Sequence, residues 1–254
     1  MRVLAWVGLF VLARKGLGWL KFLFGLVRPG LDLTARYGRG SWVLVTGSTD
    51  VGSNTESFYD NILNACEGLD VSVVVNNVGV DVLGKYCSLP VKDVQKIIDV
   101  NCYPVSMLCH KFIPRLLKRK HAGVVIVSSL AGEFPMAMHN IYSASKAFTD
   151  FLARTLAYEY PSLDVLSLRP SEVQTPMTFH KQDMFTITAR QCAEGLCRVL
   201  GRTAYSEGHW NHQLQGALYN AVPEGLFNHV FMHHIAPEFI SKRRLRYFLK
   251  TAFC

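Results

Sequence analysis

The feature that most constrains the fold is an alternation of short β-branched runs with longer helical stretches, beginning at Ser41. Such alternation is typical of parallel βαβ units, so one α/β domain is predicted. The predicted strands cover residues 42–46, 71–76, 124–128 and 165–169. The predicted helices cover residues 54–67, 91–118, 142–160 and 189–200.

Composition narrows the class of protein further. The chain has 254 residues, of which 50% are hydrophobic and 18% are charged, so it can bury a sizeable core and is not a disordered protein. Its seven cysteines are scattered and include no C-x-x-C pair, which predicts neither a disulfide scaffold nor a structural zinc site. A reducing environment that faces the cytosol is the simpler expectation.

The net charge of +8 is concentrated at the two ends of the chain. Residues 1–28 hold five bases and no acid, and residues 242–254 hold five more bases and no acid. The globular middle is therefore slightly acidic. Basic ends that are also apolar predict contact with an anionic membrane surface and argue against binding to nucleic acid.

The first 35 residues are predicted to form a membrane anchor or an interfacial helix. Residues 3–12 are an unbroken apolar run, but a clean bilayer span needs about 20 such residues. Arg14, Lys21 and Arg28 are seven residues apart and would form one stripe on a helix. Such a helix could lie in the interface, or span the membrane while its basic side chains snorkel to the surface. A soluble packing helix is the alternative, and a cleaved signal peptide is disfavoured by Arg14 and Lys15.

A turn of small residues follows the first predicted strand and reads Thr46-Gly47-Ser48-Thr49-Asp50-Val51-Gly52. Backbone N–H groups in such a turn can approach a phosphate at a helix N-terminus. An ordinary glycine-containing turn between strand and helix would look the same, so this motif alone decides nothing.

Four polar residues could carry chemistry. Tyr142 and Lys146 are spaced i, i+4, which places the ammonium beside the phenol and is expected to lower the pKa of the phenol, although one such pair can arise by chance. Ser129 ends a predicted strand thirteen residues before Tyr142 and could share a substrate oxygen with it. Asn101 lies three residues before Pro104, where a kink is expected, and by itself would be assigned a structural role.

Taken in order, these elements resemble the short-chain dehydrogenase/reductase superfamily across residues 36–215. The motifs that carry the resemblance are Thr46-Gly47, Asn76-Asn77-Val78-Gly79, Asn101, Ser129 and Tyr142-x-x-x-Lys146. Residues 169–175 resemble the Pro-Gly-x-Val-x-Thr segment of that superfamily, with Ser171 in place of glycine. Residues 76–79, residues 141–146 and the apolar leader are most similar to the microsomal branch. That branch contains very-long-chain 3-oxoacyl-CoA reductases, 17-beta-hydroxysteroid dehydrogenases and an inactive hydroxysteroid-dehydrogenase-like member.

The resemblance implies a Rossmann-like, doubly wound parallel sheet and hydride transfer with a nicotinamide cofactor. It implies that Tyr142 is the general acid, that Ser129 polarises the substrate oxygen, and that Asn101 holds a water in a proton relay. Lys146 would lower the pKa of Tyr142 and bind the nicotinamide ribose. The full set of cofactor-binding residues implied by the resemblance is Thr46, Gly47, Ser48, Asp50, Gly52, Asn76, Gly79, Tyr142, Lys146, Val173 and Thr175.

The chain departs from the family in its first half. Gly47 and Asn76 are only 29 residues apart, which leaves no room for the two βα units that carry strands 2 and 3 of the family. Val51 also stands where the family has a glycine. The sheet is therefore expected to be truncated on that side, with the strand at 42–46 as an edge whose apolar surface is uncovered on both faces.

Two functional hypotheses remain. The first is a membrane-associated oxidoreductase that binds no metal ion and acts on a lipophilic 3-oxoacyl-CoA or steroid. The resemblance alone favours NADP(H) over NAD(H) as its cofactor, because no residue of this chain can be assigned that choice. The second is a catalytically impaired homologue that serves as a binding or scaffold protein. Residues 216–254 are interpreted as a basic, aromatic appendage. By the resemblance, the protein is expected at the endoplasmic reticulum membrane with its catalytic domain in the cytosol. A homodimer is one assembly considered for it.

Overall fold

The computed structural model describes residue 6 and residues 28–47, 55–178, 180–237 and 240–241. The chain divides into a first unit, Met1–Gly30, and a second unit, Leu31–Cys254. Almost all of the expected membrane segment lies outside the described residues. Within the part of the chain that the structure does describe, no helix is both long enough and apolar enough to cross a membrane. The second unit holds the sheet and the candidate site.

The second unit contains a parallel five-stranded sheet in the order β1-β2-β3-β4-β7. Its strands are β1 (Trp42–Thr46), β2 (Val71–Asn76), β3 (Gly123–Val127), β4 (Asp164–Leu168) and β7 (Tyr205–Ser206). The four predicted strands are confirmed to within one residue at each end. Two short strands, β5 (Val173–Gln174) and β6 (Ile187–Thr188), form a separate parallel pair.

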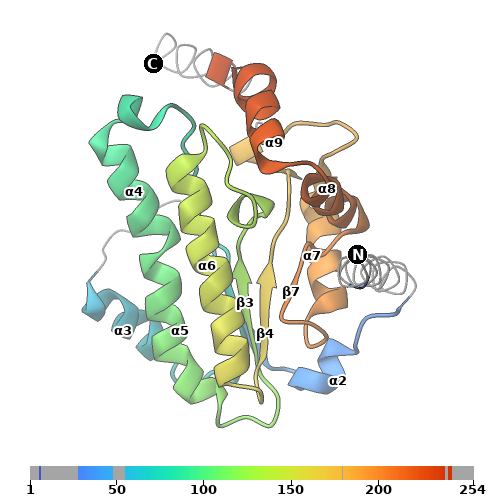
Figure 1. Cartoon of the computed structure of the whole chain (residues 1–254). Coiled ribbons are helices and arrows are strands. Elements are labelled where there is room, and N and C mark those ends of the chain that lie inside the picture. The colour runs from blue at the N-terminus through green and yellow to red at the C-terminus, as the bar shows by residue number, and fades with distance from the viewer. Residues whose placement is uncertain (1–5, 7–27, 48–54, 179, 238–239, 242–254) are drawn as a thin grey trace. The chain divides into compact units, whose positions relative to one another are not determined.

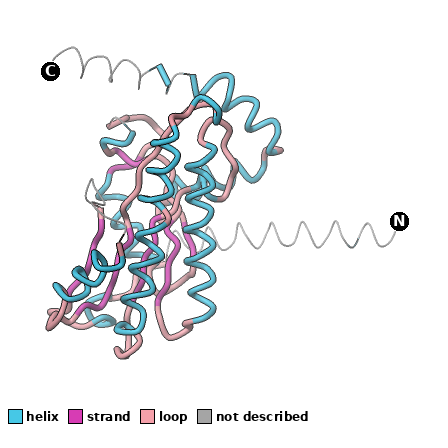
Figure 2. The backbone as a smooth tube through the Cα atoms, turned by 90° about the vertical axis from the view of Figure 1, so that its left-hand side faces the viewer, coloured by secondary structure: helices cyan, strands magenta, loops and turns pink. Residues whose placement is uncertain are grey.

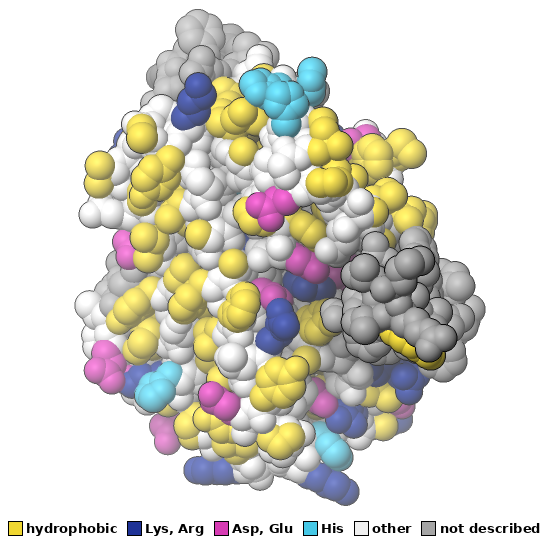
Figure 3. All heavy atoms as spheres, viewed as in Figure 1, with side chains coloured by type: hydrophobic (Ala, Val, Ile, Leu, Met, Phe, Trp, Pro, Cys, Tyr) yellow, Lys and Arg dark blue, Asp and Glu magenta, His cyan; other side chains and the backbone are white. Residues whose placement is uncertain are grey.

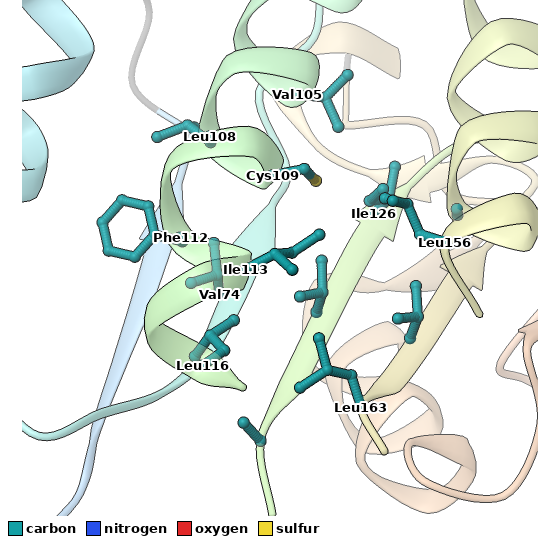
Figure 4. Packing of buried hydrophobic residues seen from close by; sticks show 14 of the residues in the cluster. Val74, Val105, Leu108, Cys109, Phe112, Ile113, Leu116, Ile126, Leu156 and Leu163 are labelled. Carbon is teal, nitrogen blue, oxygen red and sulfur yellow. The ribbon is translucent and has the colours of Figure 1, made fainter. Parts of the chain in front are cut away.

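One face of the sheet is covered by α3 (Glu56–Ala65), α5 (Tyr103–Leu116) and α6 (Asn140–Glu159). Figure 1 shows α5 and α6 side by side in front of the strands. Phe112 and Leu116 of α5 are fully buried, and they belong to the same cluster as Val74 of β2 and Ile126 of β3 (Figure 4). This cluster is the larger of the two cores and holds α6 against the sheet.

The opposite face is covered by α2 (Leu33–Tyr37) and α7 (Ala189–Val199). Val73, Val125 and Leu166 alternate with residues of the first core and point to this second face. Strands buried on both faces explain the nearly continuous runs of valine, isoleucine and leucine in the sequence.

β1 is the last strand at its edge of the sheet among the described residues. The expectation that its apolar surface is uncovered on both faces is wrong for one face, because Leu44 packs against the first core. On the other face Val43 is 52% exposed and Val45 is 60% exposed. Since α3 connects β1 to β2, it covers the face on which Leu44 lies and leaves the other open.

The long helix expected at 91–118 is two helices, α4 (Val91–Asn101) and α5, which meet at Cys102. Pro104 causes the break. It lacks the N–H that a helix interior needs, but it fits the first turn of α5, where that N–H has no intrahelical partner.

The chain after α7 forms further helices. Figure 2 shows that it is largely helical, with α8 (Trp210–Ala221), α9 (Glu224–Val230) and the π-helical turn η4 (Phe231–Ile235). α8 runs without a break through residues 215 and 216, where the appendage is predicted to begin.

Candidate active site

The carboxyl ends of β1 to β4 lie at one edge of the sheet, and the predicted site residues follow them. Thr46 ends β1 and faces Asn76 at the end of β2. The Thr46 hydroxyl accepts a hydrogen bond from the backbone N–H of Asn77 (3.1 Å). Because parallel strands end at the same edge, these turns meet the loops after β3 and β4.

Gly47 lies close to the side chain of Asn77. A Cβ at this position would lie 2.7 Å from the side-chain nitrogen of Asn77, so the exposed Asn77 side chain would have to move to make room for it. Ser48, Asp50 and Gly52, the other predicted residues of this turn, lie outside the described residues, as does Val51. Their predicted role in binding the cofactor phosphates therefore stays a prediction.

Tyr142 and Lys146 lie on the same face of α6, one turn apart. The Lys146 ammonium is 5.8 Å from the centroid of the Tyr142 ring and donates a hydrogen bond to the Val127 carbonyl (2.9 Å). Burial lowers the pKa of Lys146 to about 8, against the attraction of Cys102 and Asp81, which act to raise it. Tyr142 is half-buried, so a substrate can still reach this face of the helix.

Ser129 is brought to α6 by the segment that follows β3. The Ser128 hydroxyl donates to the Lys146 carbonyl (2.6 Å), and Gly132 lies so close that a Cβ there would be 2.6 Å from the Lys146 carbonyl carbon. The Ser129 hydroxyl accepts from the N–H of Ala131 (3.1 Å) and makes a long contact with the Pro170 carbonyl (3.4 Å). The serine therefore has one weak partner that a substrate oxygen could replace.

Asn101 is a buried bridge between the loop after β2 and α6. Its Oδ1 accepts from the N–H of Val80 (2.8 Å), and its Nδ2 donates to the Val80 carbonyl and to the Ser145 hydroxyl (2.9 Å each). Both amide hydrogens are used, and one lone pair of Oδ1 remains for the predicted water. A Cβ at Gly79 would lie 3.2 Å from the Lys146 nitrogen and 3.5 Å from the Asn101 Oδ1. Gly79, Asn101 and Lys146 thus lie close together.

Val173 and Thr175 lie at the start of the segment that follows β4 and contains β5 and β6, which we call the β5–β6 lobe. Val173 is in β5, and the Thr175 N–H donates to the Thr178 hydroxyl (3.1 Å). The base of the lobe is held by His212 of α8, whose ring accepts from the N–H of Ser171 and contacts the Glu172 carbonyl (3.2 Å each). Burial lowers the pKa of His212 to about 4, so the ring is neutral near pH 7, as these contacts require.

Two residues of this region were missed by the sequence analysis. Asp81, in the loop after β2, and His139, just before α6, form a pair next to Tyr142. The two residues are 58 positions apart in loops without periodicity, so no sequence pattern links them.

The described residues fit the nicotinamide end of a dinucleotide cofactor. The Asn76 Oδ1 is buried without a hydrogen-bond partner at the carboxyl end of β2. The buried Lys146 ammonium lies beside Gly79, where the missing Cβ leaves room. An acceptor without a partner can take a hydrogen bond from the amide group of such a ligand, and the ammonium can donate hydrogen bonds to its hydroxyl groups.

Comparison with known proteins identifies the family of the chain. Residues 38–184 match the family described as short chain dehydrogenase. The chain is 29% identical over 222 residues to a very-long-chain 3-oxoacyl-CoA reductase of Anas platyrhynchos, covering 84% of the chain and 70% of the relative. It is 31% identical over 200 residues to a 17-beta-hydroxysteroid dehydrogenase type 3 of Danio rerio, covering 75% of the chain and 65% of that relative.

A third relative is the inactive hydroxysteroid dehydrogenase-like protein 1 of Homo sapiens, 28% identical, with 89% of the chain and 88% of the relative covered. That alignment runs over 291 positions, more than the length of the chain, so it contains gaps in this sequence. The fold resembles the structure of a 7beta-hydroxysteroid dehydrogenase, with a TM-score of 0.67 at 16% identity over 78% of this chain and 98% of that one. It also resembles a 3-ketoacyl-(acyl-carrier-protein) reductase of Brucella melitensis complexed with NADH, with a TM-score of 0.55 at 20% identity over 63% of this chain and 74% of that one.

Proposed function

Because the chain belongs to the short-chain dehydrogenase family, we propose that it interconverts a carbonyl and an alcohol on a lipophilic substrate with a nicotinamide cofactor. The observation that carries this proposal is the arrangement on α6. Tyr142 and Lys146 share one face of the helix, and Gly132 holds the Ser129 segment against the backbone of the same turn. A proton donor and a cation therefore share one face of α6, and the segment that carries a second hydroxyl packs on the same helix.

In the direction of reduction, the substrate carbonyl would lie against Tyr142 and Ser129. The Ser129 hydroxyl would exchange its long contact with the Pro170 carbonyl for a hydrogen bond to the substrate oxygen. Tyr142 would then donate its phenol proton to that oxygen, and the Lys146 ammonium would stabilise the negative charge left on the phenol. The nicotinamide group, when bound, supplies the hydride.

Asn76, Gly79, Lys146, Val173 and Thr175 would hold the nicotinamide end of the cofactor. NADP(H) is proposed over NAD(H) on the basis of the resemblance to the microsomal branch. On the adenosine side β1 is the last described strand of the sheet, so we infer that this half of the cofactor makes fewer contacts than in the family.

The relatives favour an acyl thioester or a steroid as the substrate, because one is named a 3-oxoacyl-CoA reductase and another a hydroxysteroid dehydrogenase. We further propose that the basic and apolar residues 1–28 hold the protein at the endoplasmic reticulum membrane, with the catalytic domain in the cytosol. A membrane location would place the site near lipophilic substrates.

A homodimer is proposed from the outer surface of α6. Phe148, Phe151 and Tyr158 are 45%, 64% and 83% exposed on this helix. In Figure 3 hydrophobic side chains lie among charged ones on the face formed by α4, α5 and α6. Aromatic side chains such as these three are enriched at subunit interfaces.

A second candidate function is a binding protein on the same fold without turnover. The observation that favours it is the uncovered face of β1, together with the likeness to the inactive hydroxysteroid dehydrogenase-like protein. Titration with NADPH separates the two candidates, because a scaffold that lost its cofactor site would show no saturable binding.

The proposal is tested by following the oxidation of NADPH and NADH in the presence of a 3-oxoacyl thioester and, separately, of a ketosteroid. Tyr142→Phe should lower kcat at least 100-fold while the affinity for cofactor changes little, because only the transferred proton is removed. Tyr158→Phe is the matched control, since Tyr158 is on the same helix but 83% exposed. Equal activity of the wild type and Tyr142→Phe would overturn the assignment of the site.

A further inference from the structure

Helix α8 turns its apolar side chains outward and its polar side chains inward. The residues it buries include His212 and Gln215. Trp210, Leu214 and Leu218 are 50%, 36% and 53% exposed, and they lie four residues apart, so they form one row along the helix. A helix on the surface of a globular domain normally buries its apolar side. The apolar row of α8 therefore faces whatever contacts the domain from outside.

Polar contacts on the inner side fix this orientation of α8. Gln215 accepts a hydrogen bond from the Ser171 hydroxyl (2.7 Å) and donates one to the Phe185 carbonyl (2.8 Å). Asn211 donates to the Met184 carbonyl (2.8 Å). The helix cannot turn its apolar row inward without breaking these bonds. The same bonds place Met184 and Phe185 of the β5–β6 lobe, which are 77% and 48% exposed, beside the helix.

Helix α9 continues the apolar surface and buries none of its own residues. Leu226 and Val230 are 57% and 41% exposed and lie four residues apart. Other residues hold the helix, because the Phe227 ring is 4.9 Å from that of Tyr219 in α8 and Asn228 bonds to the backbone before α6. Figure 3 shows hydrophobic side chains over the part of the domain that α8 and α9 form. The two rows, which we call the α8–α9 surface, consist of Trp210, Leu214, Leu218, Leu226 and Val230.

The charges near this surface indicate what covers it. From residue 210 to residue 236 the sequence has one acid, Glu224, and no lysine or arginine. Residues 242–254, which follow, hold five bases and no acid. An apolar surface that precedes a basic segment suits an anionic lipid bilayer, and tryptophan is enriched where a protein meets the lipid headgroups. Two copies of the chain joined symmetrically at this surface would also bring together the basic segments that follow it, which disfavours a dimer here.

We propose that the α8–α9 surface rests on an anionic lipid bilayer, with the side chains of its two rows among the upper parts of the acyl chains. Amphipathic helices bind membranes in this way, lying in the plane of the interface. The contact is separate from the one proposed for residues 1–28, and it orients the domain with the β5–β6 lobe toward the bilayer. It needs no turnover, so it stands or fails independently of the proposed reaction.

Quenching of tryptophan fluorescence tests the contact at α8 itself. The chain has four tryptophans, and replacement of Trp6, Trp19 and Trp42 by phenylalanine leaves Trp210 as the single reporter. This full-length chain is reconstituted with vesicles of phosphatidylcholine and phosphatidylserine whose acyl chains carry bromine, which quenches only a tryptophan that reaches the acyl chains. The Trp210 emission should fall about 2-fold or more relative to the same vesicles without bromine, and less on phosphatidylcholine alone.

Further variants make the result specific to the two rows. Leu214→Gln combined with Leu218→Gln removes two exposed leucines, and the quenching of Trp210 should fall by about 3-fold. Leu117→Gln is the matched control and should leave the quenching unchanged, because this leucine follows α5 and is 41% exposed outside the α8–α9 surface. Tyr158→Trp, in a chain whose four tryptophans are all phenylalanine, moves the reporter to α6, where it should be quenched little. Thermal unfolding of each variant shows whether the fold is retained.

Each outcome decides the proposal. Strong quenching of Trp210 that the leucine double substitution removes supports it. No quenching, quenching that the double substitution leaves unchanged, or equal quenching of the reporter on α6 would overturn it. Equal quenching on phosphatidylcholine alone would overturn the preference for anionic lipid.

A second copy of the chain is the other occupant that the experiment can detect. A dimer in sedimentation velocity that the leucine double substitution dissociates, together with unquenched Trp210 on vesicles, would assign the surface to that copy and overturn the proposal. Oxidation of NADPH by the same chain is measured separately, so failure of this contact and failure of the proposed reaction are distinguished.

Discussion

Gly132 is the point at which the segment that carries Ser129 touches α6, so Gly132→Ala tests how the candidate site is assembled. A Cβ at Gly132 would lie 2.6 Å from the carbonyl carbon of Lys146, 2.7 Å from its oxygen and 2.9 Å from the nitrogen of Ala147. All three atoms belong to the backbone of α6 and cannot rotate away. Overpacking of this kind costs up to about 3 kcal/mol. The gain from a stiffer unfolded chain is at most about 1 kcal/mol, so the expected net loss is about 2 kcal/mol.

Urea unfolding of the wild type and Gly132→Ala measures this loss, because a shift of the midpoint at constant slope reports a change in the free energy of unfolding. Gly225→Ala in α9 is the matched control, since no atom lies within 4 Å of its added Cβ. That variant should be stabilised by about 0.5 to 1 kcal/mol. A Gly132→Ala variant as stable as Gly225→Ala would refute the close packing of this segment on α6.

Further predictions concern the ammonium, the cofactor and the membrane. The pKa of Lys146 is about 8, so its charge is present below that pH, and kcat/KM for reduction should fall as the pH rises through about 8. Lys146→Met should be much less active at every pH and should lack this step. Calorimetry should show that NADPH binds only a few-fold more tightly than nicotinamide mononucleotide, because the adenosine half of the cofactor is expected to make few contacts. Low-micromolar binding of NADPH, together with much weaker binding of the mononucleotide, would contradict this expectation. Replacement of Arg14, Lys21 and Arg28 by glutamate should move the protein from the microsomal pellet to the supernatant, and an unchanged pellet fraction would argue against the electrostatic part of the anchor.

Long periodic elements were predictable from the sequence, and short or context-dependent ones were not. Runs of β-branched residues predicted the positions of β1 to β4, because strands buried on both faces consist almost entirely of such apolar residues. β5, β6 and β7 have two residues each, which is too short for any periodicity to appear. The break at Cys102 was expected as a kink, and the fit of Pro104 to a helix start makes it two helices.

In the candidate site too, some residues were predictable from the sequence and others were not. Ser129, Tyr142 and Lys146 were predicted because they belong to a spaced motif, and the structure brings their segments together through Ser128 and Gly132. The contact of Asp81 with His139 depends on how two irregular loops meet, so only the three-dimensional structure reveals it. The sequence predicted that both faces of β1 are uncovered, and this is correct for one face only. It did not show that Leu44, on the other face, packs in the core that includes α3.

The central claim is that the face of α6 around Tyr142 carries out hydride transfer from a nicotinamide cofactor to a substrate carbonyl. The most direct test incubates the protein with a β-keto thioester and NADPH deuterated at the transferred position, and then measures the mass of the hydroxy product. The account predicts that the wild type yields product with one deuterium at the carbinol carbon and that Tyr142→Phe yields almost none. Product without deuterium, or the same labelled product from Tyr142→Phe, would contradict it.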